Sequence, residues 1–209
     1  DTNRPMLLAL LGSSSVDVVD LGIIGDDREI IARAMSQAAS HLDLLITSGG
    51  VAGSDADHLE PSVLAAGGRC KSLKLALRPG KPIARAKIGD MHVVGLPGNP
   101  VAALVNFLLF VRPLLQRLLG ASETERAGIV ATSGQTFLHK PGRTEFLPAC
   151  VASRDLQGSP ILRKLGRGGS ARLLPLVHAD GLAEIGPDVG HLDEGSVVRF
   201  HPFSTSFAI

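Results

Sequence analysis

Hydrophobic and polar positions follow two different patterns along the chain. In the first part, short apolar runs of the kind that form strands alternate with longer segments in which apolar residues recur at helical spacing. The strand-like runs are 16–24, 43–47, 70–77 and 82–96, and the last of them turns as a hairpin at Gly89-Asp90. Strands separated by helices predict an α/β domain in which helices flank a parallel sheet in three layers.

The predicted helices have recognisable start and stop signals. In the first helix, Asn3 is placed to cap the N-terminus and Gly12 to end the helix. In the last helix, Asn99 is the expected cap and Pro100 takes the first helical position, where no N–H is needed. The four predicted helices cover 3–12, 26–42, 58–67 and 99–120.

The pattern changes near Ala121. From there to Ile209 the segments are short, Gly or Pro recurs every few residues, and no long helical pattern remains. This texture is typical of a small all-β domain of the barrel or sandwich type. The sequence therefore predicts two domains, an α/β domain over 1–122 and a small, barrel-like β-domain over 123–209.

Composition and charge narrow the function. Hydrophobic residues make up 44% of the 209 residues, which suits a globular chain, and a net charge of +1 with 3% aromatic residues argues against nucleic-acid binding. The most hydrophobic stretch, 101–119, is interrupted by polar residues, which predicts a core helix and no membrane span. No secretory signal is visible, and Cys70 and Cys150 match no metal-ligand spacing, so we expect a cytoplasmic protein with reduced thiols.

One loop of the predicted sheet combines glycines with acidic residues. In an open α/β sheet, ligands bind beyond the carboxyl ends of the strands. The loop "SGGVAGSDAD" at 48–57 begins with two glycines, which let backbone N–H groups converge on an anion. Asp55 and Asp57 would repel a phosphate unless a divalent cation lay between them, so the loop predicts a phosphate-plus-metal site. An ordinary tight turn between a strand and a helix would also use glycine.

Two further loops add positive charge and a second helix start. In "RPGKP" at 78–82, two prolines stiffen the backbone, so Arg78 and Lys81 are held where they can clamp an oxyanion. The loop "GLPGNP" at 95–100 leads directly into a helix N-terminus, which also favours anions. Asp26 follows an earlier predicted strand and is expected at the same sheet edge. Each signal alone also fits a plain turn or helix start, and it is their convergence that favours a site.

The order of these motifs resembles the molybdopterin molybdenumtransferase family, of the MoeA and gephyrin E-domain type. The similarity runs over nearly the whole chain, and "RPGKP" and "LPGNP" at this spacing are highly specific. The resemblance implies that 1–120 is a molybdopterin-binding domain and that 125–209 is the family's C-terminal β-domain. The motifs that carry it are "LGIIGDD", "ITSGGV", "DAD", "KLALRPGKP", "GLPGNPVAALVNF" and "GRTEF".

The resemblance also implies a reaction and its partners. In this family adenylated molybdopterin (molybdopterin-AMP) is cleaved, AMP leaves, and molybdate is inserted at the dithiolene to give molybdenum cofactor. A divalent cation, usually taken as Mg²⁺, is required. The chain starts inside the family's third domain, without the first strand of the binding domain. A homodimer that forms through parts outside this chain is therefore expected.

Site residues follow from the resemblance, motif by motif. Asp26 and Asp57 match the family's essential aspartates and would hold the metal. Lys74, Arg78 and Lys81 match its basic residues near molybdate, and with the two aspartates they form the expected catalytic set. The residues expected to bind the substrate are Ser48, Gly49, Gly50, Ser54, Pro97, Gly98, Asn99, Arg143 and Ser170.

Two other functions stay open on the sequence. A molybdopterin adenylyltransferase shares the domain fold and a Gly-Gly loop, but it lacks an appended β-domain. A non-catalytic binding module is the second alternative, because the gephyrin E domain clusters receptors through the same architecture. Two departures from the family pattern bear on it: Ala52-Gly53-Ser54 replaces Ser-Val-Gly, and Ala102 replaces a usual serine.

Overall fold

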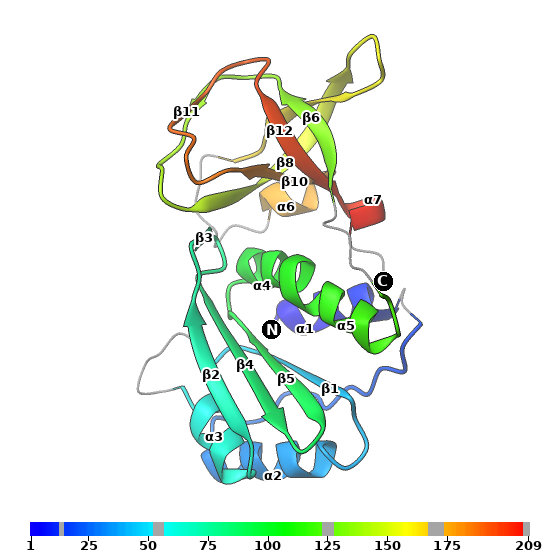
Figure 1. The fold of residues 1–209 in the computed structure, drawn as a ribbon, viewed down its shortest axis with the longest axis vertical. Helices are drawn as coiled ribbons and strands as arrows, with labels where there is room; N and C mark the ends of the chain where they lie inside the picture. The colour runs from blue at the N-terminus through cyan, green and yellow to red at the C-terminus, as the bar shows by residue number, and fades with distance from the viewer. Residues whose placement is uncertain (13–14, 52–56, 123–127, 167–173, 207–209) are drawn as a thin grey trace. The chain divides into compact units, whose positions relative to one another are not determined.

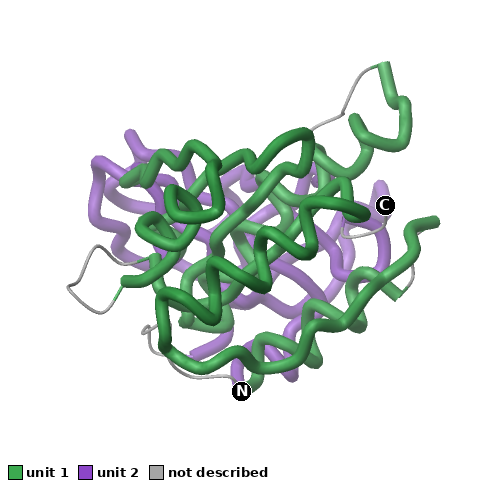
Figure 2. Tube along the Cα trace, turned by 90° about the horizontal axis from the view of Figure 1, so that it is seen from below, with its two compact units in different colours: residues 1–75, 80–122, 209 green, residues 76–79, 123–208 purple. Residues whose placement is uncertain are grey.

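The chain folds into two compact units, which Figure 2 draws in different colours. Unit 1 consists of Asp1–Leu75 and Gly80–Ser122, and unit 2 consists of Ala76–Pro79 and Glu123–Ala208. Unit 1 mixes helices with a sheet, whereas unit 2 is built almost entirely of strands. The computed structural model describes residues 1–12, 15–51, 57–122, 128–166 and 174–206.

Unit 1 is built on a four-stranded sheet in the order β1-β5-β4-β2 (Figure 1). β1 (Leu44–Ser48) and β5 (Met91–Leu96) pair in parallel. β4 (Pro82–Ile88) pairs antiparallel with both β5 and β2 (Arg69–Lys74), and it joins β5 in the predicted hairpin that turns at Gly89-Asp90. The predicted α/β class is confirmed, but the sheet is mixed instead of purely parallel, because the hairpin reverses the chain inside it.

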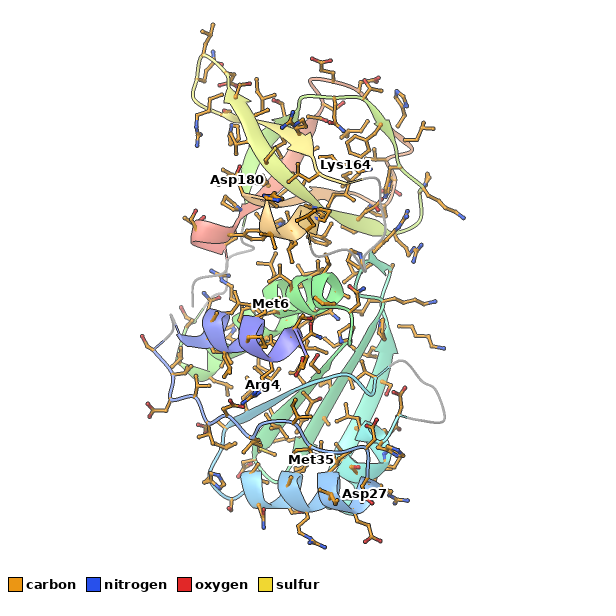
Figure 3. All side chains as sticks on the ribbon, turned by 180° about the vertical axis from the view of Figure 1, so that it is seen from behind. Arg4, Met6, Asp27, Met35, Lys164 and Asp180 are labelled. Carbon is orange, nitrogen blue, oxygen red and sulfur yellow. The ribbon has the colours of Figure 1, made fainter. Side chains whose placement is uncertain are left out.

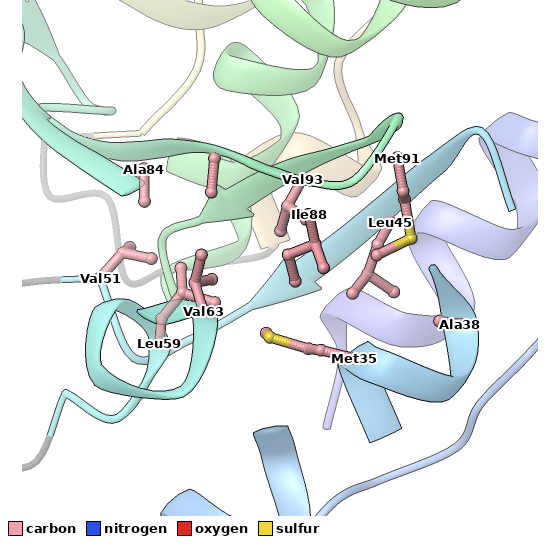
Figure 4. Packing of buried hydrophobic residues seen from close by; sticks show 11 residues of the cluster. Met35, Ala38, Leu45, Val51, Leu59, Val63, Ala84, Ile88, Met91 and Val93 are labelled. Carbon is pink, nitrogen blue, oxygen red and sulfur yellow. The ribbon is translucent and has the colours of Figure 1, made fainter. Parts of the chain in front are cut away.

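Helices cover both faces of this sheet and make the three predicted layers (Figure 1). Their bounds are α1 (Asn3–Gly12), α2 (Arg28–Ala38), α3 (Leu59–Ala65), α4 (Pro100–Asn106), the π-helical segment η1 (Phe107–Val111) and α5 (Arg112–Leu118). α2 and α3 pack on one face, and α1, α4 and α5 lie on the other. Figure 4 shows the first of these interfaces, where Met35 of α2 and Val63 of α3 point toward Ile88 and Val93 of the sheet.

Two of the helices begin with the capping residues that the sequence offers. The Asn99 side chain accepts a hydrogen bond from Ala102 N (3.1 Å), as predicted for the start of α4. Asp27 caps α2 by accepting hydrogen bonds from Ile30 N (3.0 Å) and Glu29 N (2.8 Å). These two bonds, with that from Ile30 the larger cause, lower the pKa of the Asp27 carboxyl, because they favour its charged form.

The predicted cap of α1 is wrong. Asp1, and not Asn3, accepts the hydrogen bonds of the first turn, from Asn3 N at 2.9 Å and Arg4 N at 3.3 Å. An Asp carboxylate is at least as good a cap as an Asn amide. The Asn3 side chain is thereby released for contacts elsewhere, and it is buried.

The strand predicted at 16–24 is also wrong. The described residues 15–27 form no strand and expose most of their apolar side chains, with Ile23 75% exposed. β-branched residues favour a strand only where a neighbouring strand supplies hydrogen bonds. Among the described residues β1 pairs with β5 alone. The segment is held instead by an ion pair between Asp20 and Arg4 of α1 (2.6 Å), and Figure 3 labels Arg4.

The long apolar helix is a core element. α4, η1 and α5 form one helix over Pro100–Leu118, in agreement with the predicted helix at 99–120. By length and composition alone this helix could cross a membrane, but 56% of its apolar window is buried inside the protein. Such burial is typical of the core helix of a globular domain and agrees with the interpretation of 101–119 from the sequence.

Unit 2 is a closed, barrel-like sheet. Its strands follow the order β10-β12-β6-β9-β8, and β8 pairs with β10 to close the ring, while β3 pairs with β8. β7 and β11 form a separate two-stranded sheet. The predicted small all-β domain is confirmed. The bounds are β3 (Leu77–Arg78), β6 (Ile129–Ser133), β7 (Phe137–Leu138), β8 (Thr144–Arg154), β9 (Pro160–Lys164), α6 (Leu174–Val177), β10 (Gly181–Ile185), β11 (His191–Leu192), β12 (Val197–Pro202) and α7 (Phe203–Ser206).

Candidate functional site

The loops that follow β1 and β5 lie side by side in unit 1. Ser48, the last residue of β1, is opposite Leu96 of β5, and Gly49 N donates to Leu96 O (3.0 Å). The two loops approach so closely that a Cβ on Gly98 would lie 3.8 Å from Gly49 Cα. The parallel pairing of the two strands therefore brings the predicted glycine loop and the "LPGNP" loop together.

Asn3 fastens these two loops to each other. Its Nδ2 donates to Ser48 Oγ (2.6 Å) and to Gly98 O (2.9 Å), with a longer contact to Pro97 O (3.3 Å). Asn3 is only 4% exposed, and its Oδ1 is buried without a hydrogen-bond partner. Sequence reasoning missed this role, because an Asn just ahead of a helical pattern is also what a cap looks like.

Asp57 faces the bare backbone of the glycine loop. Gly49 and Gly50 both have positive φ values, 94° and 67°, which glycine adopts far more readily than other residues. A Cβ on Gly50 would lie 4.0 Å from Asp57 Oδ1, so the carboxylate is close to the loop without touching it. Asp55 and the predicted binding residue Ser54 fall in 52–56, outside the described residues.

Asp26 lies directly before the helix that packs against the start of α3. Arg28 O accepts a hydrogen bond from Ser62 Oγ (3.1 Å). The strand that was predicted to place Asp26 at the sheet edge does not form among the described residues 15–27, so strand order does not bring Asp26 to Asp57. Within the described part of the chain, no three His, Cys, Asp or Glu side chains are grouped closely enough to hold a metal by themselves.

Two predicted lysines lie at the same end of the sheet as the glycine loop. Lys74 is the last residue of β2 and pairs with Pro82, the first residue of β4. Lys81 directly precedes β4, and its carbonyl oxygen accepts a hydrogen bond from Leu75 N (2.7 Å). Because β4 runs antiparallel to β5, the start of β4 lies where β1 and β5 end. Strand direction alone therefore places both lysines at this end.

The turn that carries Lys81 is packed tightly against α4. Gly80 is buried with φ +108°, and a Cβ on it would lie 2.8 Å from Asn106 Oδ1. Asn106 Nδ2 in turn donates to Pro82 O (3.1 Å). This packing agrees with the expectation from the sequence that "RPGKP" is a rigid mount.

The predicted arginines belong to unit 2. Arg78 in β3 pairs in parallel with Glu145 in β8, and Arg143 stands one residue before β8 begins. Arg78 is the last residue of β3 and lies opposite the second residue of β8, and Arg78 Nε lies 3.3 Å from Glu145 Oε1. Ser170, also predicted to bind substrate, falls in 167–173 and lies outside the described residues.

These features define a class of protein in which an α/β domain with a fastened glycine loop, a facing carboxylate and nearby lysines is joined to a small β-barrel domain. The chain belongs to the family of the probable molybdopterin binding domain, whose model matches residues 1–117. Residues 131–203 match a second family model, the MoeA C-terminal region (domain IV).

Known relatives agree with this assignment. The molybdopterin molybdenumtransferase of Haemophilus influenzae is 33% identical over 98% of this chain and 50% of its own length, and that of a Nostoc species is 30% identical over 69% of this chain. Among solved structures, the molybdopterin biosynthesis moea protein from Pyrococcus horikosii superposes with a TM-score of 0.74, at 29% identity over 97% of this chain and 48% of its own. The resemblance inferred from the motifs is thus confirmed. The chain spans about half the length of the curated relatives it matches.

Proposed function

We propose that the chain takes part in molybdenum cofactor synthesis as a molybdopterin molybdenumtransferase, which inserts molybdate into adenylated molybdopterin and releases AMP. The name shared by its curated relatives supports the pathway. The observation that carries the proposal is the Ser48–Gly50 loop, held by Asn3 beside Asp57 at the sheet end where Lys74 and Lys81 also lie.

The glycine loop is proposed to bind the phosphate of the adenylated substrate. Gly49 and Gly50 have no side chain to obstruct the approach of an anion to their backbone N–H groups. Ser48 Oγ is held by Asn3 and offers a hydroxyl beside them. Pro97, Gly98 and Asn99 extend this surface along the neighbouring loop, and Ser54 is proposed to join it on motif grounds alone.

The charged residues are proposed to neutralise the anionic substrates as charge develops on them. Lys74 and Lys81 supply positive charge at the sheet end in unit 1. Arg78 and Arg143 in unit 2 are suited to molybdate, because a guanidinium fork matches an oxyanion. Ser170 is assigned to the same role by motif only.

Asp57 and Asp26 are proposed to hold Mg²⁺. The residues fit this ion, because Mg²⁺ is commonly bound by one or two carboxylates together with substrate phosphates and water. Asp57 Oδ1 lies near the bare backbone of Gly50, which suits a carboxylate that shares an ion with a phosphate. When bound, the ion would supply positive charge to the leaving phosphate.

Three further features are likewise proposed. The sequence pattern supports a boundary between domains 1–122 and 123–209, the lack of a visible secretory signal supports a cytoplasmic location, and the family resemblance supports a homodimer. Gel filtration with light scattering would test the dimer directly.

The function is tested by incubating the protein with adenylated molybdopterin, molybdate and Mg²⁺ and by measuring AMP and molybdenum cofactor. We expect both products from the wild type and a loss of both from Asp57→Asn. Asp90→Asn is the matched control, because Asp90 is exposed in the hairpin turn at the opposite end of the sheet. Consumption of ATP with unadenylated molybdopterin would indicate an adenylyltransferase instead, and inertness with every substrate would indicate a binding module. Either result would overturn the proposal.

A further inference from the structure

Arg78, the arginine proposed to bind molybdate, is held by a buried carboxylate. Arg78 Nε lies 3.3 Å from Glu145 Oε1, and the two residues are opposite each other in the parallel β3–β8 pair. The backbone fixes this register, since Thr144 N donates to Ala76 O (2.9 Å). The Arg78 side chain is 47% exposed, whereas that of Glu145 is 11% exposed. A long, half-exposed side chain thus forms an ion pair with a carboxylate in the interior of unit 2.

A third residue satisfies the other oxygen of that carboxylate. His139 Nε2 lies 3.4 Å from Glu145 Oε2, and the His139 side chain is 1% exposed. The other ring nitrogen, Nδ1, lies 2.5 Å from Val189 O. A carbonyl oxygen can only accept, so Nδ1 carries a proton. Nε2 is then the ring nitrogen that faces the carboxylate, at the ion-pair distance given above.

Glu145 does not need the whole guanidinium to hold Arg78. The contact uses Nε, and a guanidinium has five N–H donors in a fixed planar fork, so the Nη groups stay available for an oxyanion.

We propose that Glu145, backed by His139, is a positioning residue that orients the Arg78 guanidinium for molybdate. This inference rests on the proposed function. Holding a long, rotamer-rich side chain before the ligand arrives lowers the entropic cost of binding. It also gives a physical role to the acidic residue of the "GRTEF" motif, whose arginine alone was singled out from the sequence.

The test is a Glu145→Met variant, assayed by AMP release at varied molybdate concentration. Methionine keeps approximately the size of the side chain, but it removes the carboxylate that holds Arg78. We expect the KM for molybdate to rise about tenfold, because the guanidinium is no longer held in place before molybdate binds. We expect kcat at saturating molybdate to stay within about twofold, as for a change in ground-state binding.

A double-mutant cycle separates positioning from general damage. In an Arg78→Ala background, Glu145→Met is expected to change the molybdate KM by less than about twofold, because the side chain that Glu145 orients is gone. Glu145→Gln keeps an oxygen for Arg78 and an N–H for His139, so it should fold normally and raise KM only about threefold. Glu194→Met, at an exposed position in unit 2, is the matched control and should leave KM unchanged.

Two results would overturn the inference while leaving the proposed function in place. One is an active Glu145→Met variant with the molybdate KM of the wild type. The other is an equal rise in KM with and without Arg78. If Glu145→Met does not fold, Glu145→Gln carries the test, and a wild-type KM there would refute the role. Absence of AMP release from the wild type would instead reject the proposed function itself.

Discussion

An Asn3→Asp variant is expected to destabilise the paired loops of the candidate site, because it replaces an N–H donor with an oxygen. In the structure, Asn3 Nδ2 donates to Ser48 Oγ at 2.6 Å and to Gly98 O at 2.9 Å. In the variant, a carboxylate oxygen faces the Gly98 carbonyl, and neither atom can donate. The contact between the loops would then be repulsive.

The size of the effect follows from burial. Leaving a buried acceptor without its donor costs about 1–3 kcal/mol, and burying a carboxylate against a carbonyl adds to this. The Ser48 hydroxyl can turn and donate to the new carboxylate, which recovers one of the two contacts. We expect the free energy of unfolding to fall by roughly 2–4 kcal/mol. Asn3→Ala should cost less, about 1–2 kcal/mol, because it also removes the buried Oδ1 that has no partner.

The pH dependence gives the prediction a distinctive sign. A protonated carboxyl can donate again, so the folded state should raise the pKa of the new side chain above the unfolded value of about 3.9. A group whose pKa is higher in the folded state than in the unfolded state contributes its full stabilisation when the pH is below the unfolded-state pKa. That stabilisation is lost as the pH rises through the folded-state pKa. The difference in stability between wild type and Asn3→Asp should therefore be smaller at low pH than at neutral pH.

Urea unfolding at about pH 5 and pH 8 measures both effects. Gln157→Glu is the control, since it makes the same change from amide to carboxyl in an exposed turn of unit 2. The reasoning is refuted if Asn3→Asp unfolds at the same urea concentration as Gln157→Glu. It is also refuted if the loss of stability becomes larger as the pH falls.

Three further outcomes are expected. Gly80→Ala should lower the free energy of unfolding by roughly 2–5 kcal/mol, because φ is +108° and the new Cβ would lie 2.8 Å from an amide oxygen. A free energy of unfolding in urea within about 1 kcal/mol of the wild-type value would contradict this. Asp27→Ala should lower the melting temperature at neutral pH. Because hydrogen bonds from Ile30 N and Glu29 N lower the pKa of Asp27, the difference in melting temperature from wild type should shrink as the pH falls below the ordinary pKa of 3.8. A constant difference between pH 3 and pH 7 would argue against this reasoning. Burial, more than nearby charge, raises the pKa of the Cys70 thiol. The rate of its alkylation by iodoacetamide, followed by mass spectrometry, should therefore begin to rise at a higher pH in the folded protein than in the urea-unfolded chain. Coincident pH profiles of the two would contradict this.

Much of the fold could be predicted because local signals and long-range packing agree. The apolar run at 43–47 became β1 at Leu44–Ser48, and the hairpin at 82–96 became β4 and β5. The Asn-Pro pair at 99–100 started the long helix where its cap and its proline required. In β5 and in α4, the apolar residues that favour the element locally are also buried in the core.

The failures occurred where a segment depends on a partner that sequence pattern does not name. The residues at 16–24 have strand propensity, but a strand also needs an open edge and a neighbour. The predicted run at 70–77 was split, because Leu77 and Arg78 pair with β8 of unit 2 instead of continuing β2. Which strands pair across long sequence separations decides where such a strand ends, and the strand propensity of individual residues contains no information about it.

The candidate site shows the same division. Glycines, lysines and aspartates could be singled out because their chemistry suits an anion and a metal, and strand order then explains why Ser48, Lys74 and Lys81 share one end of the sheet. Asn3 and Glu145 could not be identified, because their roles come from contacts with residues far away along the chain. Both residues act by orienting other residues, and such a role leaves no local pattern in the sequence.

A pair of alanine substitutions tests most directly whether this end of the sheet binds the substrate. Gly50 and Gly89 have similar left-handed φ values, 67° and 56°, and a Cβ on either meets nothing closer than 4.0 Å, but Gly89 lies in the hairpin turn at the opposite end. Equilibrium binding of adenylated molybdopterin should weaken at least about tenfold in Gly50→Ala, where the methyl group blocks the approach of the phosphate to the backbone N–H groups, and stay within about twofold in Gly89→Ala. Equal affinity in the two variants would contradict the account.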